Sequence, residues 1–345
     1  MPSNRIAGIA IAAVLGLVVA VALGLFLVTR DEPPQARGEL IAYGCREPNN
    51  RWYAICVIGV DGADPERLTS KLTTTDPAWS PDGRRIAFTR NQEVGDFTTF
   101  TDDDVFVMDA DGDAVRQVTI HRTGRSAWQP AWSPDGRRIA YVNGDSVATG
   151  VPSRWGALFV VDADGSNPQR LTRSSTDSTP AWSPDGREMA FARCRRYSSS
   201  PPRCAQDLFV IGTVGSGSRR LTRTERLSEV APAWSPDGSR IAFVTLAPID
   251  ALELQGKEGV YVVNRDGSGA KRVFAQQYLE GAVSSLAWSP DGRTIAFETA
   301  PTFDCTAISL VDVETGSVRP LTSCTRPTES AVSPAWQPDT RREEP

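Results

Sequence analysis

Apolar residues follow two different patterns along this chain. Residues 6–28 form an unbroken run of 23 residues that contains only Gly, Ala, Val, Ile, Leu and Phe. From residue 40 onward the apolar residues occur in short segments rich in β-branched and aromatic side chains, with Gly, Pro, Asn and Asp between them. The first pattern predicts a membrane-spanning helix, and the second predicts β-strands joined by turns.

The run at 6–28 is long enough to cross a bilayer once. At ~1.5 Å per residue a helix of this length covers roughly 34 Å, and the hydrocarbon core of a bilayer is ~30 Å thick. We therefore predict an uncleaved signal anchor over 6–28. The alternative is a cleaved signal peptide, because Ala20-Val21-Ala22 has the spacing of a cleavage site, although the apolar run continues to Val28.

The charges that flank this segment predict its orientation. Arg5 precedes the run, whereas Arg30 is followed at once by two acidic residues. The positive-inside rule then favours a cytoplasmic N-terminus at 1–5 and an extracytoplasmic location for everything after the anchor. Residues 29–39 are polar and contain Pro and Gly, so they are interpreted as a linker. We predict a single-pass protein of the cell membrane with its main domain outside.

A seven-residue motif, Pro-Ala-Trp-Ser-Pro-Asp-Gly, recurs along the rest of the chain. It occurs at residues 77–83, 130–136, 180–186 and 232–238, with variants at 286–292 and 334–339. The six tryptophans of the motif, spaced 48 to 54 residues apart, are Trp79, Trp132, Trp182, Trp234, Trp288 and Trp336. A repeat of this length is typical of one four-stranded blade of a β-propeller.

The two ends of the repeat region complement each other. A complete repeat contains four strand signals: Ala-Trp-Ser, a second strand such as Arg-Ile-Ala-Phe, a third that usually ends in an Asp-Gly turn, and a short Arg-Leu-Thr strand. The region begins at residue 40 without the first strand and ends with only a first strand, at 335–337. We predict an all-β, six-bladed propeller over 40–338, closed by pairing of the C-terminal strand with the N-terminal blade, and a C-terminal tail at 339–345. Closure would also protect the sheet edges.

The repeat resembles a known family. The unit Pro-Ala-Trp-Ser-Pro-Asp-Gly-Arg-x-Ile-Ala-Phe, followed by Leu-Phe-Val-x-Asp-x-x-Gly and Arg-Leu-Thr, is similar to the propeller repeat of the TolB family over about residues 40–338. The resemblance implies a propeller fold that serves binding proteins, the propellers of oligopeptidases and a few lyases. TolB itself carries an additional N-terminal α/β domain, where this chain has the predicted membrane segment.

Charge and histidine content narrow the function classes. Two of the 37 basic residues precede residue 31, so the remainder holds 35 basic and 42 acidic residues and a net charge of −7. This balance argues against nucleic acid or an anionic bilayer surface as the main partner. The single histidine, His121, and the lack of a Gly-x-Ser-x-Gly motif argue against a hydrolase and against the propeller lyases, which resemble this repeat and use several histidines and a metal. We predict no enzyme activity and no cofactor.

The six cysteines lie in three local pairs: Cys45 with Cys56, Cys194 with Cys204, and Cys305 with Cys324. Members of each pair fall on neighbouring strands or on the two ends of one loop, so each pair could form a disulfide. An even number of cysteines suits an oxidising compartment. The alternative is reduced, buried cysteine.

Aspartates at alternate positions, as in Asp109-Ala-Asp111-Gly-Asp113 and Asp162-Ala-Asp164, resemble a calcium loop. The glycine comes at the fourth position, however, and not at the sixth that an EF-hand loop requires. Asp-Gly is also a strong hairpin signal. We interpret these residues as turns, predict no metal site, and interpret the six repeat tryptophans as packing residues.

The long connections between strands share one face of the predicted ring and differ from each other in charge. Variable loops on a regular scaffold usually carry binding specificity. The alternative interpretation is that these residues lie in solvated loops and bind nothing. The candidate partner-binding residues, one acidic and one basic group, are Asp102, Asp103, Asp104, Arg193, Arg195, Arg196, Tyr197 and Arg203. The basic group would be held by the Cys194–Cys204 disulfide.

Two functions remain. The first is a non-catalytic, membrane-anchored binding or scaffold module that presents one propeller face to a protein or peptide partner in the cell envelope. The alternative is a carbohydrate-binding or other small-ligand protein, including a lyase, that uses the central channel.

Overall fold

The computed structural model describes most of the repeat region and none of the N-terminal segment. The described residues are 39–46, 52–70, 74–91, 103–120, 125–145, 155–199, 202–214, 217–224, 227–247, 256–275, 285–302, 305–323 and 330–340. Residues 1–38 form a unit of their own outside these ranges, and this unit includes the predicted membrane anchor at 6–28. Within the described ranges, no helix has the length and apolar character needed to span a bilayer.

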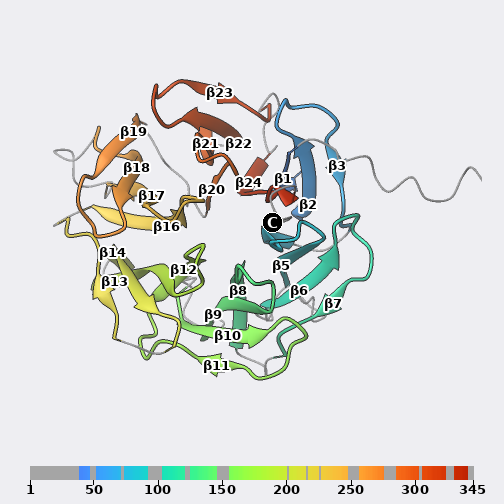
Figure 1. Ribbon diagram of the computed structural model, residues 1–345, viewed down its shortest axis with the longest axis horizontal. Helices are drawn as coiled ribbons and strands as arrows, with labels where there is room; N and C mark the ends of the chain where they lie inside the picture. The colour runs from blue at the N-terminus through green and yellow to red at the C-terminus, as the bar shows by residue number, and fades with distance from the viewer. Residues whose placement is uncertain are drawn as a thin grey trace, which may run out of the picture. The chain divides into compact units, whose positions relative to one another are not determined.

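Four antiparallel sheets of four strands each are arranged as separate blades (Figure 1). The first contains β4 (Thr74–Trp79), β5 (Arg85–Asn91), β6 (Asp103–Asp109) and β7 (Arg116–Gln117). The second contains β8 (Arg125–Trp132), β9 (Arg138–Asp145), β10 (Ala157–Asp162) and β11 (Gln169–Arg170). The third contains β12 (Asp177–Trp182), β13 (Glu188–Ser199), β14 (Pro202–Gly212) and β15 (Arg219–Arg220). The fourth contains β16 (Ser228–Trp234), β17 (Arg240–Leu246), β18 (Gly259–Asn264) and β19 (Lys271–Ala275).

The remaining eight strands form one continuous sheet, which corrects the prediction of six separate blades. Its strands are β20 (Leu286–Trp288), β21 (Thr294–Thr302), β22 (Cys305–Asp312), β23 (Val318–Pro320), β24 (Ser330–Trp336), β1 (Leu40–Arg46), β2 (Ala54–Gly59) and β3 (Glu66–Arg67). A parallel bridge between Thr306 and Ser330 joins β22 to β24. Because this bridge merges the strands predicted for two blades, only four blades stand alone.

The C-terminal strand does pair with the N-terminal one, as the complementary ends of the repeat predict. β24 lies antiparallel to β1, with Ala335 opposite Ala42 and Ala331 opposite Cys45. The Gln337 N–H donates to the Leu40 carbonyl at 2.8 Å, which extends the ladder beyond the strand. The two ends of the repeat region are thereby held in one sheet.

The Ser-Pro-Asp-Gly segments form the turns between the first and second strands of each unit. In the turn at 235–238, the Ser235 hydroxyl donates to Asp237 Oδ1 at 2.5 Å and accepts the Arg240 N–H at 2.9 Å. The Ser235 hydrogen bond lowers the pKa of Asp237 to about 2. Gly238 has φ of 68°, a left-handed conformation that favours glycine. The aspartates of the motif are therefore turn residues.

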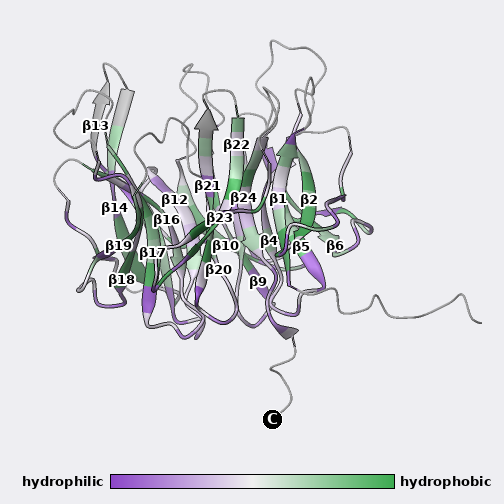
Figure 2. Cartoon of the chain, turned by 90° about the horizontal axis from the view of Figure 1, so that it is seen from above, coloured by the Kyte–Doolittle hydropathy of each residue, from purple (hydrophilic) through white to green (hydrophobic). Residues whose placement is uncertain are grey.

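The hydrophobic core lies between neighbouring sheets. Figure 2 shows hydrophobic residues along the strands and hydrophilic residues at the turns. Trp132 of β8, for example, packs against the preceding sheet, in the cluster that contains Val105 and Val107 of β6. The Arg85 guanidinium lies over the Trp132 ring at 4.7 Å, and Arg138 lies over Trp182 at 5.1 Å. Cation–π contacts and apolar burial thus join one blade to the next.

One pair of tryptophans separates the contribution of the indole N–H from that of the ring. Trp182 Nε1 donates to the Ala131 carbonyl of the neighbouring blade at 3.1 Å, whereas Trp132 Nε1 has no hydrogen-bond partner among the described residues. Both are buried, at 8% and 7% exposure, and both have an arginine over the ring. They therefore match in burial and in the cation–π contact, and they differ in the hydrogen bond.

We expect Trp182→Phe to lower the free energy of unfolding by about 1 kcal/mol more than Trp132→Phe, because only the first substitution removes a buried hydrogen bond. Urea denaturation of the two full-length variants measures the difference. Equal losses would show that the indole N–H does not join the blades.

Candidate functional site in the central cavity

The innermost strand of most units carries a bulge just before Pro-Ala-Trp. The pairing register shifts between Thr75 and Ala78 of β4, for example, and at the equivalent places in β8, β12, β16 and β24. The residues that precede proline at these bulges have φ between 51° and 55°, and they are Asp76, Gln129, Thr179, Ala231 and Ser333. The left-handed region is unfavourable for residues other than glycine, and the α region is disfavoured before proline. The surrounding ring must therefore impose this conformation.

The bulges and the Pro-Ala-Trp segments enclose a central cavity of about 530 Å³. Its wall contains the Ala-Trp pair of all six repeats and most of the flanking prolines, so most of its side chains are apolar. Polar side chains reach it at the bulges, where Asp76, Gln129 and Thr179 line it, and at Ser285, Gln337 and Asp339. Asp76 and Asp339 are the only ionisable side chains among the described lining residues.

A chain of hydrogen bonds, here called the polar belt, runs around the cavity from unit to unit. The Thr179 N–H donates to Gln129 Oε1 at 2.9 Å, and the Gln129 N–H donates to Thr89 Oγ1 at 3.2 Å. Thr89 Oγ1 in turn donates to Asp76 Oδ2 at 3.0 Å. The belt consists of Thr179, Gln129, Thr89, Asp76, Ser333 and Glu298. It links strands of three blades to the eight-stranded sheet.

The belt crosses the site of ring closure at Ser333. The Ser333 hydroxyl donates to Asp76 Oδ1 at 3.3 Å, and the Ser333 N–H donates to Glu298 Oε1. Asp76, Glu298 and Ser333 are 6%, 4% and 2% exposed. Two buried carboxylates therefore share one serine of the C-terminal strand. Acidic groups therefore lie both in the cavity wall, at Asp76, and behind it, at Glu298.

The sequence-predicted acidic group does not line this cavity. Asp103 accepts a hydrogen bond from Asn91 Nδ2 at 3.0 Å, and Asp102 lies outside the described residues. Asp104 is only 3% exposed, and its carboxylate accepts hydrogen bonds from Thr119 Oγ1 at 2.8 Å and Gln117 Nε2 at 2.9 Å. The expectation of a loop residue is wrong for Asp104, because the strand begins at Asp103 and turns its side chain inward.

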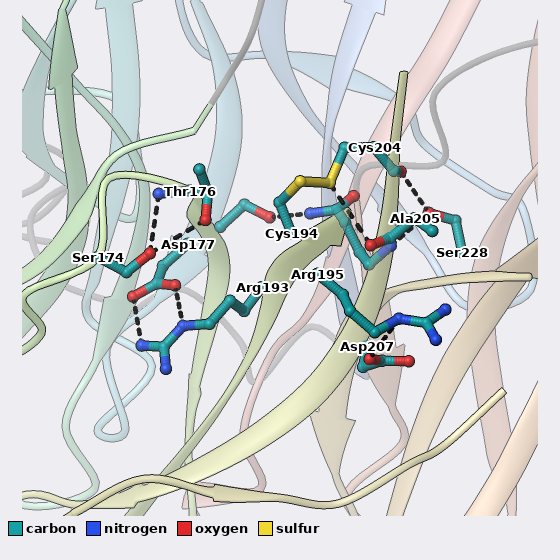
Figure 3. Close-up of a disulfide and its surroundings, with 12 residues drawn as sticks. Ser174, Thr176, Asp177, Arg193, Cys194, Arg195, Cys204, Ala205, Asp207 and Ser228 are labelled. Atoms are coloured by element: carbon teal, nitrogen blue, oxygen red, sulfur yellow. Dashed lines mark hydrogen bonds and ion pairs between the residues drawn. A yellow bond between two sulfur atoms is a disulfide. The ribbon is translucent and has the colours of Figure 1, made fainter. Parts of the chain in front are cut away.

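The sequence-predicted basic group lies on β13 and β14 of the third blade, away from the cavity lining. Arg193 forms a bidentate pair with Asp177, at 2.6 and 2.9 Å (Figure 3). Arg195 pairs with Asp207 at 3.1 Å. For Arg196, Tyr197 and Arg203 the structure describes the backbone only. Arg193 and Arg195 thus neutralise two carboxylates that have no solvent exposure.

Buried acids gather beside this pair. Arg220 also forms an ion pair with Asp207, at 2.8 Å. Burial nevertheless raises the pKa of Asp207, although the two arginines act to lower it. Burial also raises the pKa of Glu229, with the Asp207 charge adding to the rise, while hydrogen bonds from Thr222 and Thr224 lower it. These groups lie where β14 meets β16, and none of them lines the cavity.

Disulfides occur where the sequence predicts them. Cys45 is bonded to Cys56 and Cys194 to Cys204. Cys305 is also disulfide-bonded, and its predicted partner Cys324 lies outside the described residues. His121 lies outside them too.

A family model described as the TolB beta propeller domain matches residues 152–342. The chain belongs to the TolB β-propeller domain family. That membership agrees with the repeat, the blades and the disposition of the tryptophans.

Individual relatives of this TolB-type chain match it over different lengths. The Tol-Pal system protein TolB of Alcanivorax borkumensis is 36% identical over 67 residues, which are 19% of this chain and 13% of that protein. The uncharacterized protein Atu1656 of Agrobacterium fabrum is 28% identical over 247 residues, 71% of this chain and 61% of that protein. The chain thus spans less than two thirds of the length of these curated relatives. The crystal structure of TolB from Acinetobacter baumannii, at 20% identity, has a TM-score of 0.67 and covers 87% of this chain and 67% of that one.

Sequence reasoning missed the cavity residues. Asp76, Gln129 and Thr179 precede Pro-Ala-Trp in their repeats, and the residue at this position varies while the motif after it does not. That contrast is the signal that could have identified them. What the sequence does not reveal is the bulge, which brings this position to the cavity of the TolB-type propeller.

We expect Ala231→Gly to destabilise the protein by at least ~1 kcal/mol less than Ala233→Gly. Both residues lie in β16, but only Ala231 has a positive φ, 54°, and glycine relieves a strain of ~1–2 kcal/mol there. Chemical denaturation of both variants measures the difference. If Ala231→Gly were the more harmful, the bulge would not be strained.

Proposed function

We propose that this TolB-type propeller is a non-catalytic binding module that holds a segment of a protein or peptide partner in its central cavity. The partner would carry a cationic side chain that enters the cavity. Residues 6–28 would anchor the module in the cell membrane, with the propeller on the extracytoplasmic side.

The observation that carries this proposal is the chemistry of the cavity wall. Its volume of about 530 Å³ lies within the range of ligand pockets. Six tryptophans line it together with Asp76 and Asp339, and no lysine, arginine or histidine is among the described lining residues. Aromatic rings and carboxylates both attract cations. A lysine or arginine of a peptide therefore complements the wall better than an anion does.

The make-up of the same wall supports binding rather than catalysis. Pro, Ala and Trp side chains supply no acid, base or nucleophile, and they form most of the lining. Asp76 accepts hydrogen bonds from the hydroxyl of Thr89 in its own blade and from that of Ser333 in the eight-stranded sheet, and it is held in place by them. A carboxylate fixed in this way is suited to orienting a ligand.

The disulfides support an extracytoplasmic location. Disulfides persist in oxidising compartments and are rare in the cytosol. Cys45–Cys56 and Cys194–Cys204 both lie within the propeller, which would be outside the membrane in the proposed orientation.

A basic probe peptide tests the proposal. Full-length protein in detergent is titrated into fluorescein-labelled (Ser-Lys)₅, and binding is measured by fluorescence anisotropy. We expect Asp76→Asn to weaken binding about tenfold, because a hydrogen bond to a charged group contributes ~1.5–3 kcal/mol. Asp111→Asn, in an exposed turn, is the matched control and should bind as the parent does.

Equal binding by the Asp76→Asn variant and the parent would contradict a role for the cavity acid. A second arm distinguishes the small-ligand alternative. If neutral oligosaccharides raise the melting temperature and the peptide does not, the propeller is a carbohydrate-binding protein and the proposal is wrong.

A further inference from the structure

The third blade contains a two-stranded ribbon that extends beyond its sheet. β13 pairs with β12 only as far as Arg193 opposite Asp177, and β14 pairs with β15 only at Phe209 and Val210. Past these points β13 and β14 continue to pair with each other as far as Ser199 opposite Pro202. We call residues 194–199 and 202–206 the ribbon.

The base of the ribbon is held by a disulfide and by contacts with two neighbouring strands. The Cys194–Cys204 disulfide joins its two strands. The Ser228 hydroxyl of β16 accepts the Gln206 N–H at 3.0 Å and donates to the Cys204 carbonyl at 3.1 Å. Gln206 Nε2 donates to the Ser178 hydroxyl of β12 at 3.0 Å. A ribbon held in this way loses little conformational entropy when it binds a partner.

Charges at the base are compensated. Arg193 is paired with Asp177 and Arg195 with Asp207 (Figure 3). Arg220 also pairs with Asp207, and both carboxylates are fully buried. These arginines are therefore engaged in ion pairs within the blade. Any partner of the ribbon would have to bind residues nearer its tip.

The backbone register brings two further arginines together on the outer part of the ribbon. Arg196 lies opposite Ala205, and Arg203 lies opposite Ser198. Because alternate residues share a face, Arg196, Ser198, Arg203 and Ala205 occupy the same face of the ribbon. No acidic residue occurs between Glu188 and Asp207. Like charges at diagonal positions, ~7–8 Å apart, do not stabilise a ribbon by themselves.

We propose that this ribbon face binds an extended acidic segment of a partner protein through Arg196 and Arg203. Carboxylates at positions i and i+2 of an extended strand lie ~6.6 Å apart, which matches the diagonal spacing of the two arginines. Guanidinium groups bind carboxylates in a planar, bidentate geometry. An anionic lipid surface suits the ribbon less well, because lipid headgroups lack the fixed spacing of carboxylates along an extended strand.

The proposal is independent of the cavity, since the two sites would take ligands of opposite charge. Fluorescein-labelled (Thr-Glu)₄, with acids at alternate positions, is the probe, and full-length protein in detergent is titrated at low ionic strength and at 0.15 M salt. We expect the doubly substituted Arg196→Glu, Arg203→Glu protein to bind at least tenfold more weakly. Added salt should weaken binding to the parent, because exposed ion pairs are screened.

Two comparisons make the result decisive. Arg223→Glu changes an exposed arginine outside the ribbon and should bind (Thr-Glu)₄ as the parent does. Arg196→Lys with Arg203→Lys preserves charge and should retain part of the binding, and equal melting temperatures verify that all variants are folded. Unchanged binding by the double glutamate variant would overturn the proposal. So would a loss of binding to phosphatidylglycerol vesicles without any loss of peptide binding.

Discussion

Pairing of β24 with β1 is the constraint on which the rest of the structure depends. These strands come from opposite ends of the repeat region, and their ladder places Ala335 beside Ala42 and Ala331 beside Cys45. Closure removes two sheet edges that would otherwise remain open to another chain. It also brings Ser333 to Asp76, so the polar belt passes from the last strand to the first complete blade.

The cavity follows from that closure and from the repeat. Each unit contributes a similar short segment to the wall, and in most units the bulge before it makes one variable position reach the interior. Trp132 and Trp182 lie between a blade and its neighbour while also facing this space, with Arg85 and Arg138 over their rings. The same residues that join the blades therefore form most of the binding surface. Variation among Asp76, Gln129 and Thr179 then sets the chemistry of the cavity without altering the scaffold.

Local chemistry explains which features could be predicted from the sequence. The Ser-Pro-Asp-Gly turns depend on contacts within five residues, such as Ser235 with Asp237 and Arg240, so their position and role follow from the motif. The cysteine pairs lie only 11 and 10 residues apart, and their bonding follows from the hairpins that contain them. Pairing of the C-terminal strand with the N-terminal one follows from the complementary ends of the repeat.

Non-local contacts explain what could not be predicted. The bridge between Thr306 and Ser330, which merges two expected blades into one sheet, has no signal in either segment. Asp104 stands in a run of aspartates, yet Thr119 and Gln117 from another strand bury it. The sequence suggests that Arg193 is an exposed cation, whereas in the structure it pairs with the buried carboxylate of Asp177. In each case the decisive partner is 13 or more residues away in the sequence.

Native-state hydrogen exchange tests closure most directly. Amides of residues 330–336 and 40–46 are followed by mass spectrometry as urea is raised below the unfolding transition. If the β24–β1 ladder closes the ring, both segments exchange only in the global unfolding event and show the same free energy of opening. Rapid exchange of 330–336, at urea concentrations where 54–59 stays protected, would contradict closure and the cavity built on it.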